Sequence, residues 1–232
     1  MHKIMSILVW LFFPIHLAVA QSSLFAYITN AATPSYLSMC PIDTVTGQFK
    51  TCQPMFLDHL STPIGVALAT LDATTYAYIS NNNYPNEVLR CVVGDEGHLH
   101  ACALTGVPAY TGIAIHKSDA LYAYLAYSNS VEKCRLSKNG ELSQHACEDS
   151  GAGQIFNNGP IYMRFITFNA HTYVYIANGD YQRNASVIQC RVTAAGDFTA
   201  CKDAGAGATF NGAADVDFAH SAGRTYAYVT EP

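Results

Sequence analysis

TYAYISN, residues 75–81, is one of five tyrosine-rich runs that recur along this chain of 232 residues. Taking Tyr78 as the reference position, the intervals between successive runs are 51, 46, 51 and 53 residues. The other four runs are LFAYITN (24–30), LYAYLAY (121–127), TYVYIAN (172–178) and TYAYVTE (225–231). A period of about 50 residues is typical of stacked units, as in solenoids and propellers.

The first four tyrosine runs are each followed by a segment with a cysteine at both ends and a glycine between them. These segments are CPIDTVTGQFKTC (40–52), CVVGDEGHLHAC (91–102), CRLSKNGELSQHAC (134–147) and CRVTAAGDFTAC (190–201). Two short runs around a glycine-containing turn predict a β-hairpin, which places the two cysteines across the ladder within disulfide reach. We therefore predict four disulfides: Cys40–Cys52, Cys91–Cys102, Cys134–Cys147 and Cys190–Cys201. The alternative is zinc, which the absence of C-x2-C spacing disfavours.

A short run precedes each of the last four tyrosine runs. These runs are PIGVAL (63–68), TGIAI (111–115), RFITF (164–168) and DVDF (215–218). Four short strands per repeat, without helical periodicity, predict an all-β propeller of four-stranded antiparallel blades. Small residues such as Gly65 and Gly112 suit the innermost strand near the crowded axis. We predict a single domain over residues 21–232, with repeats at about 24–72, 73–119, 120–170 and 171–223 and a partial one at 224–232.

The first and last tyrosine runs are both second strands of a blade in this scheme, so they cannot fill one blade together. We expect about four blades plus an incomplete fifth repeat. Two interpretations stay open. Either the chain is a shortened relative of a larger propeller, or its open edge pairs with another chain, because an uncovered edge strand favours association.

The runs AYITN, AYISN, YIAN and AYVTE, which follow G-[VI]-A-like strands, resemble the YVTN-type β-propeller repeat in its cysteine-bearing form from exported bacterial proteins. The resemblance covers residues 24–231. It implies a propeller fold. Members of this family range from lactonase-like enzymes to surface and binding proteins, so the resemblance implies an architecture more strongly than an activity.

The N-terminus has the layout of a secretory signal peptide over residues 1–20. Lys3 precedes an apolar run at 4–17, and Ala18-Val19-Ala20 predicts cleavage before Gln21. We expect a protein secreted to the periplasm or the outside of the cell, without a membrane span, because no later stretch reaches the ~20 apolar residues required. Only 12% of residues are charged and the net charge is −5. Without a basic stripe, nucleic acid and anionic lipid are not expected partners.

Asp215 and Asp217 are the main candidate site residues. They alternate on an inner strand and share a face that would look into the central channel. Two carboxylates there could bind a cation or act as acid and base. The alternative is that both are solvent-exposed acids on an incomplete repeat. Arg164 and Thr167, from the preceding inner strand, complete this candidate binding set.

Other candidates carry weaker signals. His98 and His100 could offer two metal ligands, but no third ligand is predictable, so we expect neither a metal nor a cofactor. Three loop tyrosines could stack on a sugar or peptide, and one tripeptide fits the glycosylation sequon. These are Tyr84, Tyr110 and Tyr181, and Asn184-Ala185-Ser186.

The glycine-rich stretch CEDSGAGQIFNNG (147–159) has the look of a phosphate-binding loop, but it has a counterpart, CKDAGAGATFNG (201–212). Neither copy is followed by a helix pattern, so both are predicted to be crossovers between blades. We expect Asp149 and Asp203 to accept hydrogen bonds from backbone N–H groups and Phe156 to pack between blades, as does its counterpart Phe210.

No nucleophile motif is present, and every cysteine is assigned to a disulfide. The favoured function is therefore non-enzymatic: a module that binds a protein or a glycan. One alternative is a lactonase-like or other hydrolytic enzyme with an acidic channel site. Another is a partial propeller without independent activity. Acids occur on only one of four inner strands, which favours the binding module.

Overall fold

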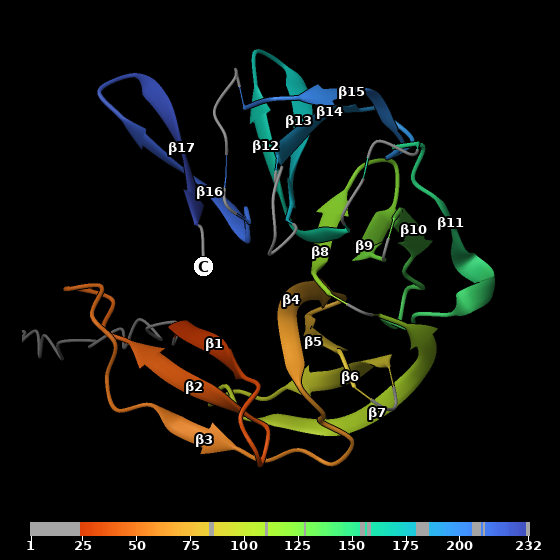
Figure 1. The fold of residues 1–232 in the computed structure, drawn as a ribbon. Helices are drawn as coiled ribbons and strands as arrows, with labels where there is room; N and C mark the ends of the chain where they lie inside the picture. The colour runs from red at the N-terminus through yellow and green to blue at the C-terminus, as the bar shows by residue number, and fades with distance from the viewer. Residues whose placement is uncertain are drawn as a thin grey trace, which may run out of the picture.

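The computed structural model describes residues 24–83, 86–109, 111–127, 129–153, 156, 159–179, 186–205, 210 and 212–230. These residues form five antiparallel sheets arranged in chain order around a common centre (Figure 1). The predicted all-β propeller is therefore confirmed. Several predictions lie outside the described residues: the signal peptide, Tyr84, Tyr110, Tyr181, and Asn184 and Ala185 of the sequon.

The five sheets are named A to E in chain order. Sheet A contains β1 (Leu24–Asn30), β2 (Tyr36–Ile42) and β3 (Gln53–Met55), and sheet B contains β4 (Pro63–Leu71), β5 (Thr74–Asn81), β6 (Glu87–Val93) and β7 (Leu99–Pro108). Sheet C contains β8 (Ile113–Lys117), β9 (Leu121–Ala126), β10 (Val131–Arg135) and β11 (Cys147–Asp149), with the short 3-10 helix η1 (Gln144–Ala146) before β11. Sheet D contains β12 (Pro160–Phe168), β13 (His171–Asn178), β14 (Ser186–Val192) and β15 (Phe198–Asp203), and sheet E contains β16 (Asp215–Ser221) and β17 (Arg224–Thr230).

The inner strands β4, β8, β12 and β16 contact one another in sequence near the centre (Figure 1). Among the described residues, β1 is the innermost strand of sheet A, and it contacts β4. As expected from the sequence, the equivalent strands β1 and β17 belong to different sheets. The Tyr162 hydroxyl on β12 donates a hydrogen bond to the carbonyl of Ile64 on β4. Part of the central region is therefore filled by a side chain that spans from sheet D to sheet B.

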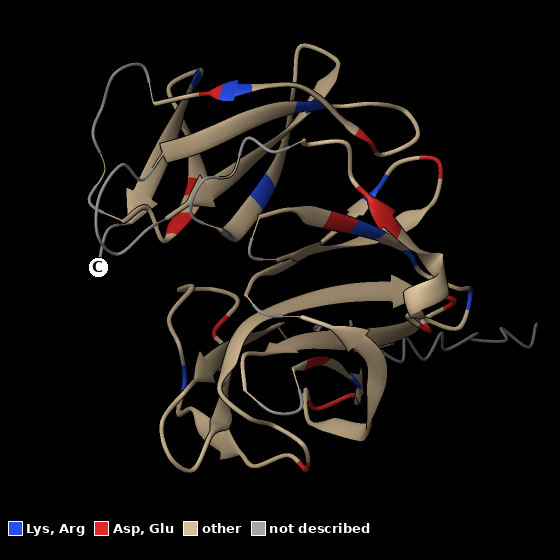
Figure 2. Cartoon of the chain, turned by 45° about the vertical axis from the view of Figure 1, so that its right-hand side comes forward, with Lys and Arg blue, Asp and Glu red and all other residues tan. Residues whose placement is uncertain are grey.

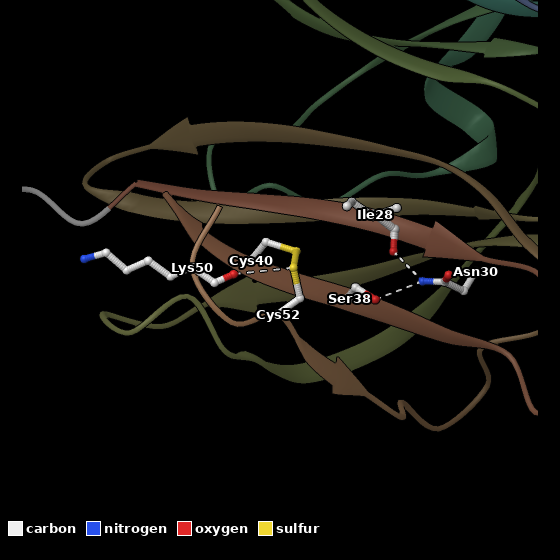
Figure 3. Close-up of a disulfide and its surroundings, with 6 residues drawn as sticks. All are labelled: Ile28, Asn30, Ser38, Cys40, Lys50 and Cys52. Carbon is white, nitrogen blue, oxygen red and sulfur yellow. Dashed lines mark hydrogen bonds between the residues drawn. A yellow bond between two sulfur atoms is a disulfide. The ribbon is translucent and has the colours of Figure 1, made fainter. Parts of the chain in front are cut away.

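All four predicted disulfides are present, one in each of sheets A to D. In sheet C, Cys134 and Cys147 lie directly opposite each other in the ladder. In sheet A, Cys40 on β2 is joined to Cys52, just before β3 (Figure 3). The first cysteine of each pair is buried. Four disulfides are typical of an oxidising, extracytoplasmic compartment. In the described part of the chain, no helix has the length and apolar character needed to cross a membrane.

The repeated tyrosines join neighbouring sheets. A tyrosine on β1, β5 or β9 donates its hydroxyl hydrogen to the carbonyl of the glycine in the cysteine hairpin of the next sheet. The three bonds are Tyr27 to Gly97 at 2.6 Å, Tyr78 to Gly140 at 2.7 Å, and Tyr124 to Gly196 at 2.8 Å. We call this repeated interaction the tyrosine–glycine contact. It explains why both residue types recur in register along the chain.

A second element of each junction is the side chain two residues after the hairpin glycine. It is apolar in every copy, and in sheets B, C and D it packs into the core shared with the preceding sheet. Leu99, Leu142 and Phe198 are all buried at this position. The Phe198 ring stacks on Tyr124 with 5.0 Å between ring centroids. Sheets B, C and D are thus each joined to the preceding sheet by this hydrogen bond and by one buried side chain.

The residue before the first cysteine adds a cation in two sheets. Arg90 donates to the carbonyl of Asn139 at 3.0 Å, and Lys133 donates to that of Ala195 at 3.2 Å. Lys133 is only 3% exposed and pairs with Glu148 at 3.0 Å and with Asp197. Burial opposes its charge, but the hydrogen bonds to these two carboxylates outweigh burial and raise the pKa of Lys133.

The two glycine-rich crossovers behave as predicted where they are described. Asp149 accepts a 2.7 Å hydrogen bond from the Gly151 N–H, and Asp203 accepts one of the same length from Gly205. Phe156 is buried in the core between sheets C and D. At its described positions, the stretch makes the turn and core contacts of a crossover between sheets.

Replacing Gly196 by alanine is expected to lower the free energy of unfolding by about 2–3 kcal/mol. Gly196 has φ +84°, and an added Cβ would lie 2.7 Å from the Tyr124 hydroxyl. Gly47 is the matched control, because it has φ +72° but nothing within 4 Å of an added Cβ. Gly47→Ala should therefore cost only the backbone strain, about 1 kcal/mol. Urea denaturation of both variants measures the difference, and equal losses would show that the tyrosine–glycine contact contributes nothing.

Candidate functional site

A cleft of about 770 Å³ lies at the rim between sheets C and D, and we call it the C/D cleft. The β12–β13 turn forms one wall. Asn169 and Ala170 both have positive φ, which is typical of a tight two-residue hairpin turn. The Asp119 N–H donates to the carbonyl of Ala194 at 3.1 Å, so the turns of the two sheets are tied together. The cleft is lined by His116, Lys117, Ser118, Asp119, Ala170, His171, Thr172, Arg191, Val192, Thr193, Ala194 and Thr199.

Arg191 and His171 form a paired polar group on the sheet D side of this cleft. The Arg191 Nη2 lies 3.1 Å from the His171 Nδ1. A guanidinium can only donate, so Nδ1 accepts and the imidazole proton lies on Nε2. Both side chains are exposed. The guanidinium keeps further N–H groups that could bind a carboxylate in a bidentate manner.

The sheet C side of the cleft contributes the His116 ring and one carboxylate, that of Asp119. The His116 ring stacks on Phe165, with 4.4 Å between centroids and 3° between planes. Burial lowers the pKa of His116, which keeps the ring neutral at pH 7. The Asp119 carboxylate accepts a 3.0 Å hydrogen bond from the Tyr122 hydroxyl. With Lys117 and Arg191 against one carboxylate, the cleft favours an anionic group.

A second cleft, of about 720 Å³, lies at the equivalent rim position between sheets A and B. Its lining includes Thr75 and Val92, the counterparts of Thr172 and Arg191, and His100 at the position of Thr199. We call it the A/B cleft. The A/B cleft is formed by equivalent positions of the repeat, but Val92 stands where the C/D cleft has Arg191. Comparing the two clefts therefore isolates the contribution of the guanidinium.

The predicted aspartates lie elsewhere, on the inner strand β16. The Arg164 guanidinium on β12 lies between them, with Nη2 3.7 Å from an Asp215 oxygen and Nε 3.8 Å from an Asp217 oxygen. Each carboxylate also accepts a hydrogen bond from the next N–H along its own strand. Neither aspartate lines the A/B or C/D cleft. Three of the four predicted site residues therefore form a partly neutralised, solvent-accessible cluster.

The remaining predicted residues are spread over the rim. The Thr167 hydroxyl lies 2.9 Å from that of Thr172, which lines the C/D cleft. His100 lines the A/B cleft, and His98 is exposed before β7. Among the described residues, the one grouping with metal-ligand spacing is Glu132 with Cys134 and Cys147, whose sulfurs form a disulfide.

Sequence reasoning did not identify Arg191, His171 or His116 as a group. They lie on three different strands in two repeats, and no local motif connects them. One signal was available in the repeat alignment. The residue after the first cysteine of the pair is proline, valine, arginine and arginine in the four repeats, so it is cationic in the third and fourth, at Arg135 and Arg191. Charged residues are sparse and dispersed over the chain (Figure 2), so a cationic residue at a cleft is informative.

The fold defines a disulfide-linked, propeller-like repeat protein. The sequence matches no protein-family model and no curated protein. One similar solved structure is a protein of unknown function from Bacteroides caccae, with 13% identity and a TM-score of 0.43 over 83% of this chain and 67% of that chain. Another is the dihydro-heme d1 dehydrogenase NirN in complex with DHE, with 12% identity and a TM-score of 0.36 over 81% of this chain and 39% of that chain. Likeness at this level assigns no function.

Proposed function

We propose that this protein is an exported, non-enzymatic glycan-binding module, and that it binds a carboxylate-bearing sugar in the C/D cleft. The observation that carries the proposal is the Arg191–His171 pair beside the neutral His116–Phe165 stack. A guanidinium recognises a carboxylate through paired hydrogen bonds. The neutral ring and the rim hydroxyls of Thr172 and Thr199 suit the apolar and hydroxyl faces of a sugar.

We also propose that the chain belongs to the YVTN-type repeat family and is exported through a signal peptide. The recurring tyrosine of that repeat makes the tyrosine–glycine contact, and four disulfides suit an oxidising compartment. Export through the signal peptide requires that the secreted protein begin at Gln21 with all eight cysteines oxidised. Intact mass and N-terminal sequencing measure both, and free thiols or an uncleaved N-terminus would contradict it.

The hydrolytic alternative rests on Asp215 and Asp217. Both carboxylates are paired with Arg164, and the cluster lies apart from the lining of the two clefts. A general acid and base need a substrate pocket beside them. The C/D cleft is such a pocket, and its Arg191–His171 pair is suited to binding a ligand. Binding is therefore the function that we propose.

The Arg191→Val variant should weaken binding of an acidic oligosaccharide by about 10- to 100-fold, because a charge-assisted hydrogen bond contributes about 1.5–3 kcal/mol. Valine is the residue that the same scaffold carries at this position in sheet B, so the variant should fold normally. The probes are an oligosaccharide of uronic acids and a neutral oligosaccharide of equal length. Isothermal titration calorimetry measures both affinities, and thermal melting verifies the fold.

Arg224→Val is the matched control, since Arg224 is exposed at the start of β17 and away from the cleft. It should leave affinity unchanged. The affinity of the wild type for the acidic probe should also fall as salt rises, because the site is solvent-accessible. Equal binding of acidic and neutral probes, or equal affinity in wild type and Arg191→Val, would overturn the proposal.

A further inference from the structure

Asp119 is the one acidic side chain among the described residues that line the C/D cleft, where it accompanies the cations Lys117 and Arg191. All three side chains are exposed. Within the described part of the chain, none of the three takes part in an ion pair. The cleft therefore offers a ligand one negative and two positive charges that do not neutralise one another.

The turn that carries Asp119 differs from the equivalent turns of sheets B and D. The β8–β9 turn has three residues between its last ladder pair, whereas the β4–β5 and β12–β13 turns have two. Counted back from the first tyrosine of the following run, Asp119 stands where those turns carry Ala73 and Ala170. The Asp119 N–H donates to the Ala194 carbonyl at 3.1 Å. The backbone of the acid is thus held against sheet D, which forms the opposite wall of the cleft.

The carboxylate of Asp119 is also held in place. Its Oδ1 accepts a 3.0 Å hydrogen bond from the Tyr122 hydroxyl. Tyr122 is only 8% exposed, and the Lys133 ammonium lies 5.0 Å from the centre of its ring. Burial raises the pKa of Tyr122, so at pH 7 its hydroxyl keeps the proton that it donates. The other oxygen, Oδ2, has no hydrogen-bond partner among the described residues and remains available to a ligand.

A carboxylate at this position distinguishes between the groups that decorate acidic sugars. It can only accept hydrogen bonds, and it repels other anions. A sugar hydroxyl can donate to it. A sulfate ester has no proton to donate and is itself negative. Exchanging a hydroxyl for a sulfate near Asp119 therefore removes a hydrogen bond and adds a like-charge contact.

We propose that Asp119 determines the specificity of the C/D cleft, admitting sugars whose anionic group is a carboxylate bound by Arg191 and rejecting sugars that also carry sulfate. The proposal rests on the proposed function of this cleft and narrows its ligand class. Asp119 contacts a ligand hydroxyl directly, while the Tyr122 hydroxyl and the Ala194 carbonyl position it.

The test compares two probes that differ only in sulfate. One is an unsulfated chondroitin hexasaccharide, which carries a uronic acid in each disaccharide, and the other is the same hexasaccharide with one sulfate per disaccharide. Isothermal titration calorimetry with the wild-type full chain should show a preference of about tenfold for the unsulfated probe. This preference should shrink as salt rises, because the repulsion acts at an exposed site.

Asp119→Asn removes the negative charge and keeps a carbonyl oxygen that can accept from the Tyr122 hydroxyl. It should bring the two affinities within about twofold of each other, chiefly by binding the sulfated probe more tightly than the wild type does. A gain of affinity cannot result from a damaged fold. Asp95→Asn is the matched control, since Asp95 is an exposed acid that lines the A/B cleft, and it should leave both affinities unchanged.

The outcomes separate this proposal from the one on which it rests. If the wild type binds neither probe, the proposed function fails and the specificity falls with it. If the wild type binds both probes equally, or prefers the sulfated one, the cleft binds acidic sugars but Asp119 does not select among them. An unchanged preference in Asp119→Asn, or an equal gain for both probes, also overturns the role of Asp119.

Discussion

Reduction of the four disulfides will unfold the protein under conditions in which the oxidised form is folded. The bridges close short loops, with sequence separations of 11, 12 and 13 residues. Each should contribute roughly 2–3 kcal/mol on the chain-entropy model. Together they would supply roughly 10 kcal/mol, which is comparable to the whole stability of a typical domain, about 5–15 kcal/mol.

Thermal melting followed by circular dichroism, with and without a reductant, measures this loss. Thiol titration must show that all eight cysteines are reduced. A double variant, Cys40→Ser with Cys52→Ser, serves as the graded control and should lose about 2–3 kcal/mol while staying folded. If the fully reduced protein melts within a few degrees of the oxidised one, the sheets are stable without their bridges.

Phe198→Ala is expected to lower the free energy of unfolding by about 3–5 kcal/mol. The side chain is 1% exposed and stacks on Tyr124, so its removal leaves a cavity at the junction of sheets C and D. Phe49 provides the matched control, because it has the same residue type and the same position in sheet A. Phe49→Ala should cost less than about 1 kcal/mol, as exposed positions usually do.

Urea denaturation of both variants measures the two losses. The two variants remove the same atoms from the same hairpin position. The difference between their unfolding free energies therefore reports the burial that the preceding sheet provides. Similar losses in both variants would contradict the described packing of the junction.

The sheets and disulfides could be predicted because they depend on local periodicity. Each repeat carries its strands and its cysteine hairpin within about 50 residues, and alternation fixes which side chains share a face. Cys134 opposite Cys147 is one result of such local geometry. The separation of β1 and β17 into different sheets also followed from counting equivalent strands.

The junctions could not be predicted, because their partners lie far apart in sequence. Tyr124 and Gly196 are separated by 72 positions, and the hydrogen bond between them depends on how two sheets pack. The alignment did contain a clue in the apolar residue two positions after each glycine, such as Leu99 and Phe198. The burial of that residue depends on the preceding sheet, whose position the sequence does not show.

The sequence predicted a cluster of inner-strand residues but not the C/D cleft. Asp215, Asp217 and Arg164 do lie together, since inner strands of adjacent sheets are neighbours. The C/D cleft was missed, because its walls come from turns in two repeats and a cavity depends on the volume that side chains leave unfilled. Arg191 carries no motif, and only its place at the rim gives it a candidate role.

The tyrosine–glycine contact joins two unlike surfaces, so it gives the row of repeats a direction. Sheets B and C each present a tyrosine to the following sheet and a hairpin glycine to the preceding one, so the contact fixes the direction in which the repeats follow one another. A gene could gain or lose whole repeats by duplication or deletion, because each inserted copy brings both halves. Inverting a repeat, or cutting within one, would leave unmatched ends. The contact thus permits changes in the number of repeats but fixes their direction along the chain.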